Sequence, residues 1–538
     1  MSLKPVELQR SFYHTSTLCG ELFGPANRYW LFRERILPKL SALRAKLESL
    51  YCEGNGRPAV DPVRLAGVTL LQFMEKVPDR AAAEHGVYHL GWKYALDLEL
   101  TDGGFHPTVL VYFRDRLEEK ESERVIFDGI VELLIELGLV KRKGKQRLDS
   151  THILGYVKEM SRLECAVESM RLALEALAEE VRCAERAKFW GRLWALYVQS
   201  ELNWRLSKGE RKSRYRQCGQ DMEELIEWID ADHAELGELE AVKLLRRVFS
   251  EQFEVVEGKL QPTAKRPPRS VHNPHDPDAH YADKGKKQWV GYKVHVVESV
   301  DPNEPAKRKG EPTESFITEI LTTEAAQDEM AGLAEALKRQ QDQHEIQPEA
   351  MYADAGYVTE NTLTQAEQNG MELLGPTRPD PHKGPYNADA FSVDIDKRQA
   401  VCPQGKTSTQ WSHIQDAYMG TQYYRIEWGS QCDFCAARRQ CTRSKNGRRI
   451  LVVGLRHDLV EKRRKEMREA EFSKNMHPRN GIEGTHSELV RGHGLRRTKY
   501  RGLSRVGLSH YLMGAACNVK RYLNLLAFQM RQTALSPA

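Results

Sequence analysis

The sequence lacks the features that mark a secreted or membrane protein. It contains no apolar run of about 18 residues, and its first residues, MSLKPVELQRSFYH, do not form a charged-then-apolar signal segment. We therefore expect a cytoplasmic protein with no membrane span. The chain also lacks a strong net charge, because 80 lysines and arginines against 76 acidic residues leave a formal charge of +4. Net charge alone therefore does not indicate nucleic-acid binding. Any such prediction must rest on where the charges lie along the chain.

Cysteine and proline are scarce over long stretches. Six of the ten cysteines are scattered, which indicates free thiols rather than a disulfide framework. No proline occurs between Pro107 and Pro262, and apolar residues from Met160 to Val181 recur at steps of three and four. We expect two long helices, at about 160–181 and 221–253, that fold as an antiparallel hairpin. The hairpin would serve for packing or an oligomer contact, or as an arm that tracks DNA.

Short helices are predicted before this block and strands around it. Asp61-Pro62 is typical of a helix N-terminus, and the short helices up to about residue 135 suit a helix-turn-helix DNA-binding unit or a small all-α scaffold. Alternating segments predict strands at 146–153, 288–297, 316–321, 350–357 and 371–374, with a helix at 327–341 and a linker at 262–283. This order predicts a mixed α/β sheet with Asp149 and Asp354 on separate strands.

The remaining four cysteines form a cluster. Cys432 and Cys435 make a C-x2-C knuckle, Cys441 follows shortly after, and Cys402 lies in an earlier turn. Four thiolates at two turns are typical of a closed, structural zinc site within a β-rich insertion. Free or redox-active cysteines are the alternative, and His413 could replace Cys402 as a ligand.

Glu483 stands in a strongly basic stretch, Arg479 to Arg505. A carboxylate there either makes local salt bridges or holds a divalent cation beside a polyanion. Together with Asp149 and Asp354 it would form a site suited to magnesium, which prefers hard oxygen ligands. Two such ions would stabilise the attacking and leaving oxygens of a displacement at phosphorus. Ordinary solvated acids are the alternative interpretation.

Four motifs carry a resemblance to a known family. LDSTHI around Asp149, GYKVH from Gly291, YADAGY around Asp354 and RNGIEGTHSELVR from Arg479 resemble the DDE transposases of bacterial insertion sequences, in particular the group with IS1182 and IS5-like elements. The resemblance implies an RNase H-like fold in which Asp149, Asp354 and Glu483 bind two Mg²⁺, with Mn²⁺ as a possible substitute. The last family motif is imperfect, since Met476 replaces a tyrosine and Arg491 lies one position late. Glu488 is the alternative to Glu483.

The resemblance also implies contacts with DNA. Arg479, one helical turn before Glu483, would bind a phosphate bidentately or else form an intrahelical ion pair. Tyr500 would offer a stacking surface, and a solvated basic face is the alternative. The expected DNA-binding residues are Lys293, His295, Arg479, Arg491, Arg496, Arg497, Lys499, Arg501 and Arg505.

The predicted architecture is α/β, an RNase H-like mixed sheet with insertions. We expect an N-terminal helical DNA-binding domain (1–140), the first core strand (141–155), a helical hairpin (156–262), further core (263–376), a β-rich insertion with the four-cysteine zinc site (377–455) and C-terminal helices with the catalytic glutamate (456–538). The implied function is transposition by a homodimer on double-stranded DNA, namely terminal inverted repeats and target DNA, in a bacterial nucleoid. An RNase H-like nuclease or resolvase, and a catalytically inert DNA-binding regulator, are the alternatives.

Overall fold

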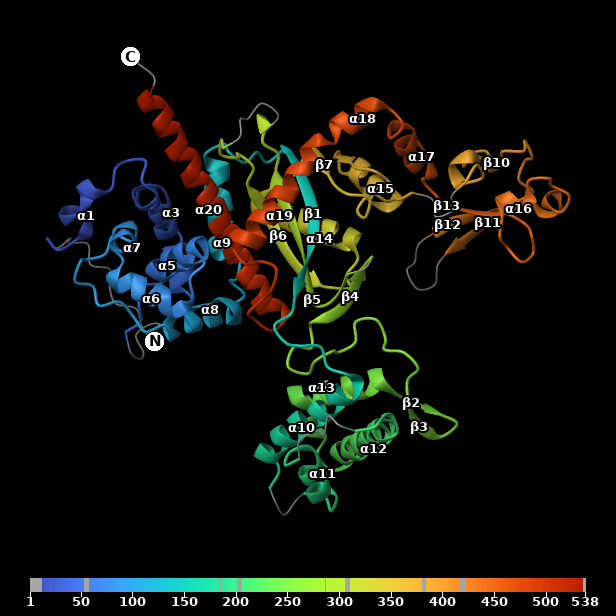
Figure 1. Cartoon of the computed structure of the whole chain (residues 1–538), viewed down its shortest axis with the longest axis horizontal. Coiled ribbons are helices and arrows are strands. Elements are labelled where there is room, and N and C mark those ends of the chain that lie inside the picture. Colours follow the sequence, from blue (N-terminus) through green and yellow to red (C-terminus); the bar gives the residue numbers. More distant parts are fainter. Residues whose placement is uncertain are drawn as a thin grey trace.

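The computed structural model describes residues 12–52, 58–182, 186–200, 206–285, 287–304, 310–379, 384–415 and 422–535. The chain forms a mixed α/β body with a central sheet, N-terminal helices on one side and two projecting parts, one helical and one β-rich (Figure 1). No helix among the described residues is long and apolar enough to cross a membrane. No disulfide joins the nine described cysteines, and the five scattered ones among them are free thiols, as expected.

The N-terminal region is helical, as its capping signals predict. Asp61 accepts hydrogen bonds from the backbone amides of Val63 and Arg64, and Pro62 occupies the first position of α5 (Pro62–Glu75). The other helices are α1 (Thr15–Leu18), η1 (Gly20–Leu22), α2 (Arg28–Leu31), the π-helical η2 (Phe32–Ile36), α3 (Leu37–Ala42), α4 (Arg44–Glu48), α6 (Asp79–Tyr88), α7 (Leu90–Ala95), α8 (Thr108–Glu119) and α9 (Val125–Glu136).

Six strands form the central sheet: β1 (Lys145–Leu154), β4 (His280–Lys284), β5 (Lys287–Ser299), β6 (Ile317–Glu324), β7 (Ala350–Tyr352) and β8 (Glu372–Leu374). β5 pairs antiparallel with β1, β4 and β6, whereas β1, β7 and β8 are parallel. The helices α14 (Glu329–His344) and α15 (Glu360–Gln368) precede β7 and β8. The predicted strands are confirmed, except that the one expected at 350–357 already ends at Tyr352.

The proline-free block is helical but is more broken than its pattern predicts. It contains α10 (Arg162–Glu180), α11 (Trp190–Tyr197), α12 (Lys208–Asp232) and α13 (Glu240–Gln252), which surround a core of their own (Figure 1). The single helix expected at 221–253 is wrong. A capping box of Ser207 and Glu210 begins α12 earlier, and the chain turns at η4 (Ala234–Glu238), which contains the weak helix former Gly237.

The segment expected as a linker at 262–283 is largely packed, which corrects that prediction. It follows the small hairpin of β2 (Phe253–Val256) and β3 (Lys259–Pro262) and ends in β4. Asn273 and Asp276 are buried. The Asn273 amide donates to the Lys158 carbonyl over 2.8 Å, and the Tyr292 hydroxyl donates to Asp276 over 2.5 Å. The segment therefore fastens the helical block to the sheet.

The C-terminal third contains the predicted β-rich part and then helices. The β-rich part comprises η6 (Ala388–Ala390), β9 (Ser392–Asp394), β10 (Gln399–Val401), β11 (Gln410–Gln415), β12 (Gln422–Glu427), η7 (Gly429–Cys432), α16 (Arg438–Cys441) and β13 (Ile450–Gly454), around a core with Phe391 and Trp428. α17 (His457–Glu466), α18 (Ala470–Asn475), η8 (His477–Asn480), α19 (Gly481–Gly492) and the 33-residue α20 (Leu503–Leu535) follow. α20 contacts β6, α5 and α9, and so joins the sheet and the N-terminal helices in one core.

Candidate active site

Asp149, on β1, lies near Asp354, which follows the end of the neighbouring parallel strand β7. β1 pairs with β7 in a register that sets Arg147 beside Tyr352, so that both aspartates lie two residues further along. Asp354 accepts a hydrogen bond of 2.8 Å from the Gly356 amide, in the turn after β7. Burial raises the pKa of Asp149 to about 6, and the negative charge of Asp354 adds to the shift. The two carboxylates therefore interact in a poorly solvated place.

Arg479 links Asp149 to Glu483, which lies in the first turn of α19. The Arg479 guanidinium lies 3.5 Å from the Asp149 carboxylate and 3.9 Å from that of Glu483. The Glu483 side chain is 71% exposed, so it faces solvent at the rim of the site. Among the described residues, the three acids do not bring their oxygens within 4.8 Å of one another. Arg479 places a positive charge between Asp149 of β1 and Glu483 of α19. Its contact with a phosphate stays a prediction.

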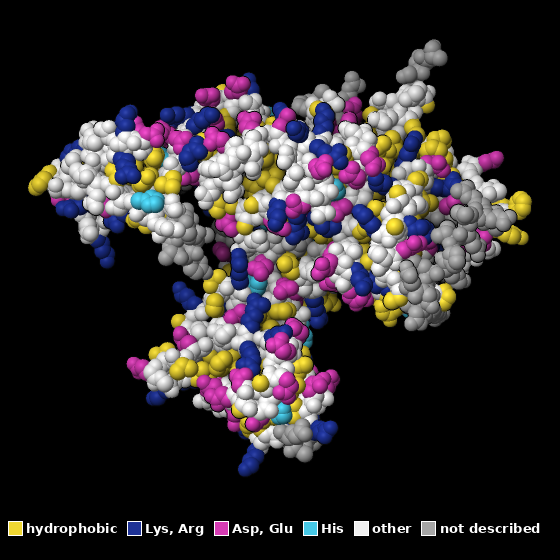
Figure 2. Space-filling model, turned by 180° about the vertical axis from the view of Figure 1, so that it is seen from behind, with side chains coloured by type: hydrophobic (Ala, Val, Ile, Leu, Met, Phe, Trp, Pro, Cys, Tyr) yellow, Lys and Arg dark blue, Asp and Glu magenta, His cyan; other side chains and the backbone are white. Residues whose placement is uncertain are grey.

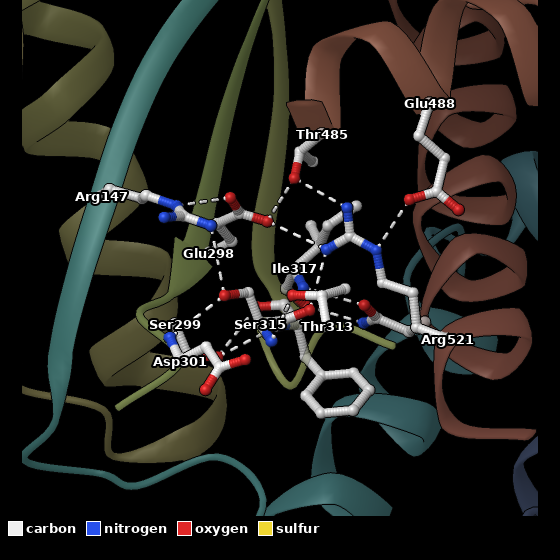
Figure 3. Close-up of polar contacts among 12 residues, drawn as sticks. Arg147, Glu298, Ser299, Asp301, Thr313, Ser315, Ile317, Thr485, Glu488 and Arg521 are labelled. Atoms are coloured by element: carbon white, nitrogen blue, oxygen red, sulfur yellow. Dashed lines mark hydrogen bonds and ion pairs between the residues drawn. The ribbon is translucent and has the colours of Figure 1, made fainter. Parts of the chain in front are cut away.

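A buried ionic network fixes α19 against the sheet (Figure 3). Glu298 of β5 is fully buried and accepts hydrogen bonds from Arg147 at 2.6 Å, from Arg521 at 3.0 Å and from the Thr485 hydroxyl at 2.6 Å. Burial alone would raise the pKa of Glu298, but Arg521 and Arg147 hold it below its usual value. Arg147 also donates to the Pro478 carbonyl over 2.6 Å. The network therefore sets the position of the chain immediately before Arg479.

Gly481 permits this close approach at the start of α19. A Cβ at this position would overlap the terminal nitrogens of the Arg147 guanidinium. That guanidinium donates hydrogen bonds to Glu298, Glu304, Ser315 and the Pro478 carbonyl, so it cannot move away without breaking them. A glycine is therefore required two residues before Glu483.

A fourth carboxylate, Glu329, lies beside the two aspartates, and sequence reasoning missed it. It is the first residue of α14, and its side chain is 15% exposed. The Ser150 hydroxyl donates to it over 3.5 Å, and a Cβ at Gly356 would overlap its carboxylate and lie 3.0 Å from that of Asp354. A glutamate in a first helical turn is common. Only the packing of α14 on the sheet distinguishes this one, so no sequence signal could have found it.

Lys293 and His295 do not form the expected DNA-facing pair. They share one face of β5, but α14 covers it. His295 is fully buried, with Nδ1 2.8 Å from the Tyr357 hydroxyl, and burial lowers its pKa to about 3. The prediction for His295 is corrected, since it packs the helix on the sheet. The Lys293 ammonium donates to the Gln327 carbonyl over 2.7 Å and lines a cavity beside the site.

The basic residues after Glu483 divide into an exposed and an engaged group. Arg491, Arg497, Lys499 and Arg501 are exposed. Arg496 instead donates to the His152 carbonyl over 2.6 Å, at the end of β1. On the face drawn in Figure 2, lysines and arginines are interspersed with acidic residues, in keeping with the small net charge.

Besides Arg496, Arg505 and Tyr500 also contact other parts of the protein, which corrects their expected roles. Arg505 forms ion pairs with Asp115 and Glu118 of α8, so it is not a free DNA contact. Tyr500 is half-buried against the core, and the guanidinium carbons of Arg114 and Arg505 lie 6.0 Å from its ring. The tyrosine therefore does not offer an open stacking surface.

The four clustered cysteines line one small cavity of about 30 Å³ beside Trp428. Burial raises the pKa of the Cys441 thiol, and the charges of Cys432, Cys402 and Cys435 act in the same direction. Within the described part of the chain, no three of their sulfurs lie within 4.8 Å of one another. His413, on β11, is not among the cavity's lining residues. The fold thus gathers the four thiols, and zinc binding remains a prediction.

Glu488, His493 and Cys517 are the described residues whose ligand atoms do lie within 4.8 Å of one another. Glu488 accepts a hydrogen bond of 2.9 Å from Arg521, and burial raises the pKa of Cys517 to about 12. Because Arg521 already balances Glu488 and the thiol stays protonated, this group stabilises the packing of α19 on α20. Glu488 is correspondingly less suited than Glu483 to the site at Asp149.

Comparisons with known proteins identify two matching family models. One, described as Transposase DDE domain, matches residues 401–523 and so includes the cysteine cluster and Glu483. The other, described as Transposase domain (DUF772), matches the N-terminal helices over residues 21–116. No curated protein and no solved structure gives a match. Two transposase models thus match at opposite ends of a chain that carries the Asp149, Asp354 and Glu483 motifs, which confirms its resemblance to the DDE transposases.

Proposed function

We propose that this transposase cleaves DNA at the ends of an insertion sequence and joins the freed 3′ ends to target DNA. The observation that carries the proposal is the proximity of Asp149 on β1 and Asp354 just after the parallel strand β7, with Arg479 linking Asp149 to Glu483. The central sheet supports an RNase H-like core, because β6, β5 and β1 are neighbouring antiparallel strands, with β4 also paired to β5, and β7 and β8 continue the sheet parallel to β1.

Asp149, Asp354 and Glu483 are the proposed ligands of two magnesium ions, for which manganese can substitute. The site fits such ions, since burial first and the neighbouring Asp354 charge second raise the pKa of Asp149, which Arg479 only partly offsets, and carboxylates are hard oxygen ligands. When bound, the two ions supply an activated nucleophile and stabilise the leaving oxygen at phosphorus. Arg479, once released from Asp149, is placed to bind a phosphate of the reacting strand.

The remaining parts have supporting roles in the proposal. Arg491, Arg497, Lys499 and Arg501 bind phosphates of double-stranded DNA near the site, and the N-terminal helices bind the terminal repeats. Cys402, Cys432, Cys435 and Cys441 hold one structural zinc ion that braces the β-rich part. Since two element ends must be joined, the active form on DNA is a homodimer.

The proposal is tested with the DNA that flanks the protein's own gene. Incubation with Mg²⁺ should give nicks that map to the element ends, followed by strand-transfer products. Asp354→Asn should retain DNA binding and lose both products, whereas the matched control Asp342→Asn, an exposed aspartate at the far end of α14, should behave as wild type. Cleavage without joined products would favour a nuclease or resolvase. Binding without any cleavage by the wild type in Mg²⁺ or Mn²⁺ would indicate a regulator.

A further inference from the structure

A cavity of about 860 Å³ is lined by Ser150 and Glu329, which lie beside the proposed metal ligands. Its walls are the end of β1, the β4–β5 hairpin, the residues before α14 and two arginines from distant segments. Five of the lining side chains are basic, namely Lys284, Lys287, Lys293, Arg378 and Arg496, and three are acidic, namely Asp283, Asp328 and Glu329. Only Lys293 and Arg496 were singled out by sequence reasoning, so most of this basic wall is created by the fold.

The cavity is continuous with the proposed catalytic site. Ser150 and Glu329 line it, and Ser150 follows Asp149 directly on β1. Lys284 lies 3.5 Å and Arg378 lies 3.7 Å from the Glu329 carboxylate, so one acid holds two cations at the border between cavity and site. Both cations are well exposed, at 64% and 68% of their side chains. They are therefore free to exchange Glu329 for a phosphate.

Basic side chains outnumber acidic ones in the wall of the cavity. Burial lowers the pKa of His152, which lines the cavity, to about 4, and the nearby charges of Arg496, Lys287 and Lys284 contribute to this shift. Lys284 and Lys287 are direct cross-strand partners at the end of the β4–β5 hairpin, so their side chains leave the sheet on the same face. Tyr281 and Trp289 add aromatic surface to the wall.

We propose that this cavity binds an unpaired stretch of DNA strand next to the scissile phosphate. Lys284, Lys287 and Arg378 neutralise its phosphates, and Tyr281, the partly exposed aromatic residue of the wall, accepts a base. The cavity falls within the range of roughly 300–1,000 Å³ of small-ligand pockets, which a few nucleotides can fill and a duplex cannot. The inference rests on the proposed function, because it names the state of the DNA that the same site receives.

The test is equilibrium binding in EDTA, with a fluorescent oligothymidylate of about 12 nucleotides and a duplex of equal length, over a series of KCl concentrations. Lys284→Ala/Lys287→Ala should bind the single strand at least tenfold more weakly at low salt. Its salt slope should fall by about 1.4, since each phosphate contact on single strands contributes about 0.7. Arg378→Ala, from another segment, should lower the slope by about 0.7. The matched control Lys141→Ala/Lys143→Ala removes two exposed lysines beyond the other end of β1.

Equal single-strand binding by the double variant and the control would overturn the inference. So would a loss of duplex binding as large as the loss of single-strand binding. Because the assay contains no metal and needs no cleavage, it separates the two proposals. Loss of single-strand binding in a protein that never cleaves DNA would leave the cavity assignment intact and remove the proposed function.

Discussion

At the residue scale, the ionised carboxylate of Asp149 is less favourable in the folded protein than in the unfolded chain. The carboxylate lies in the middle of β1, receives one hydrogen bond of 2.7 Å from the Ser150 amide, and meets only a distant guanidinium at 3.5 Å. Its raised pKa means that the folded chain holds a proton more tightly than the unfolded chain does. The metal-free protein therefore loses stability as the pH rises between the usual pKa of 3.8 and about 6. A cation at the site would remove this penalty.

Replacing Asp149 by Asn should therefore stabilise the metal-free protein above pH 6. The expected gain in the free energy of unfolding is about 1–3 kcal/mol at pH 7–8, from roughly 1.4 kcal/mol per pKa unit, and it should vanish below about pH 4. Thermal unfolding across this pH range in EDTA measures it. If the variant were less stable than wild type at pH 8, the ionised Asp149 carboxylate would not destabilise the metal-free fold, and the argument from its burial beside Asp354 would be wrong.

Arg147 is expected to be the most sensitive positioning residue. Arg147→Ala leaves the fully buried Glu298 with one guanidinium instead of two, and such losses cost about 3–5 kcal/mol. The control is Arg142→Ala, whose side chain is 43% exposed and pairs with Glu132, so its loss should cost at most about 1 kcal/mol. Denaturant unfolding compares the two. Equal effects would mean that the network does not hold α19 in place.

At the element scale, we expect the stability of the β-rich part to depend on a bound metal ion. Its core is small, centred on Phe391, Ile426 and Trp428, and the cysteines lie at the edge of that core. Small units of this kind commonly require a structural metal. Cys432 ends η7 and Cys441 ends α16, while Cys435 lies between these helices and Cys402 follows β10. Among the described residues, no three of the four sulfurs converge to coordination distance. Zinc would draw them together.

Elemental analysis should find about one zinc per chain, as a closed four-thiolate site requires. Cys432→Ser/Cys435→Ser should lose more than half of it and lower the melting temperature of the β-rich part. Cys19→Ser/Cys52→Ser, which changes two scattered cysteines, should retain the metal. Retention of zinc by the first variant would exclude the knuckle as its site.

At the scale of the whole molecule, local sequence patterns predict the helices and strands, whereas the contacts between them depend on tertiary packing. The cap at Asp61-Pro62, the alternation in β1 and β5 and the heptad spacing in α10 are local signals, and the structure confirms the elements that they predict. Glu329, the Arg147–Glu298–Arg521 network and the burial of His295 depend on which elements pack together. No local pattern encodes that packing. Asp149, Asp354 and Arg479 could be singled out from the predicted elements and the family resemblance, whereas the contact between Arg479 and Asp149 emerged only from the fold.

The central claim is that Asp149, Asp354 and Glu483 share a metal site. The most direct measurement replaces Mg²⁺ by Fe²⁺ in the DNA-free protein, generates hydroxyl radicals with ascorbate and peroxide, and maps the backbone cuts by mass spectrometry. Cuts should cluster near residues 149, 354 and 479–483, and excess Mg²⁺ or Asp354→Asn should suppress all three together. Cuts confined to the cysteine cluster or to Glu488 and His493, with none near Asp149, would contradict the account.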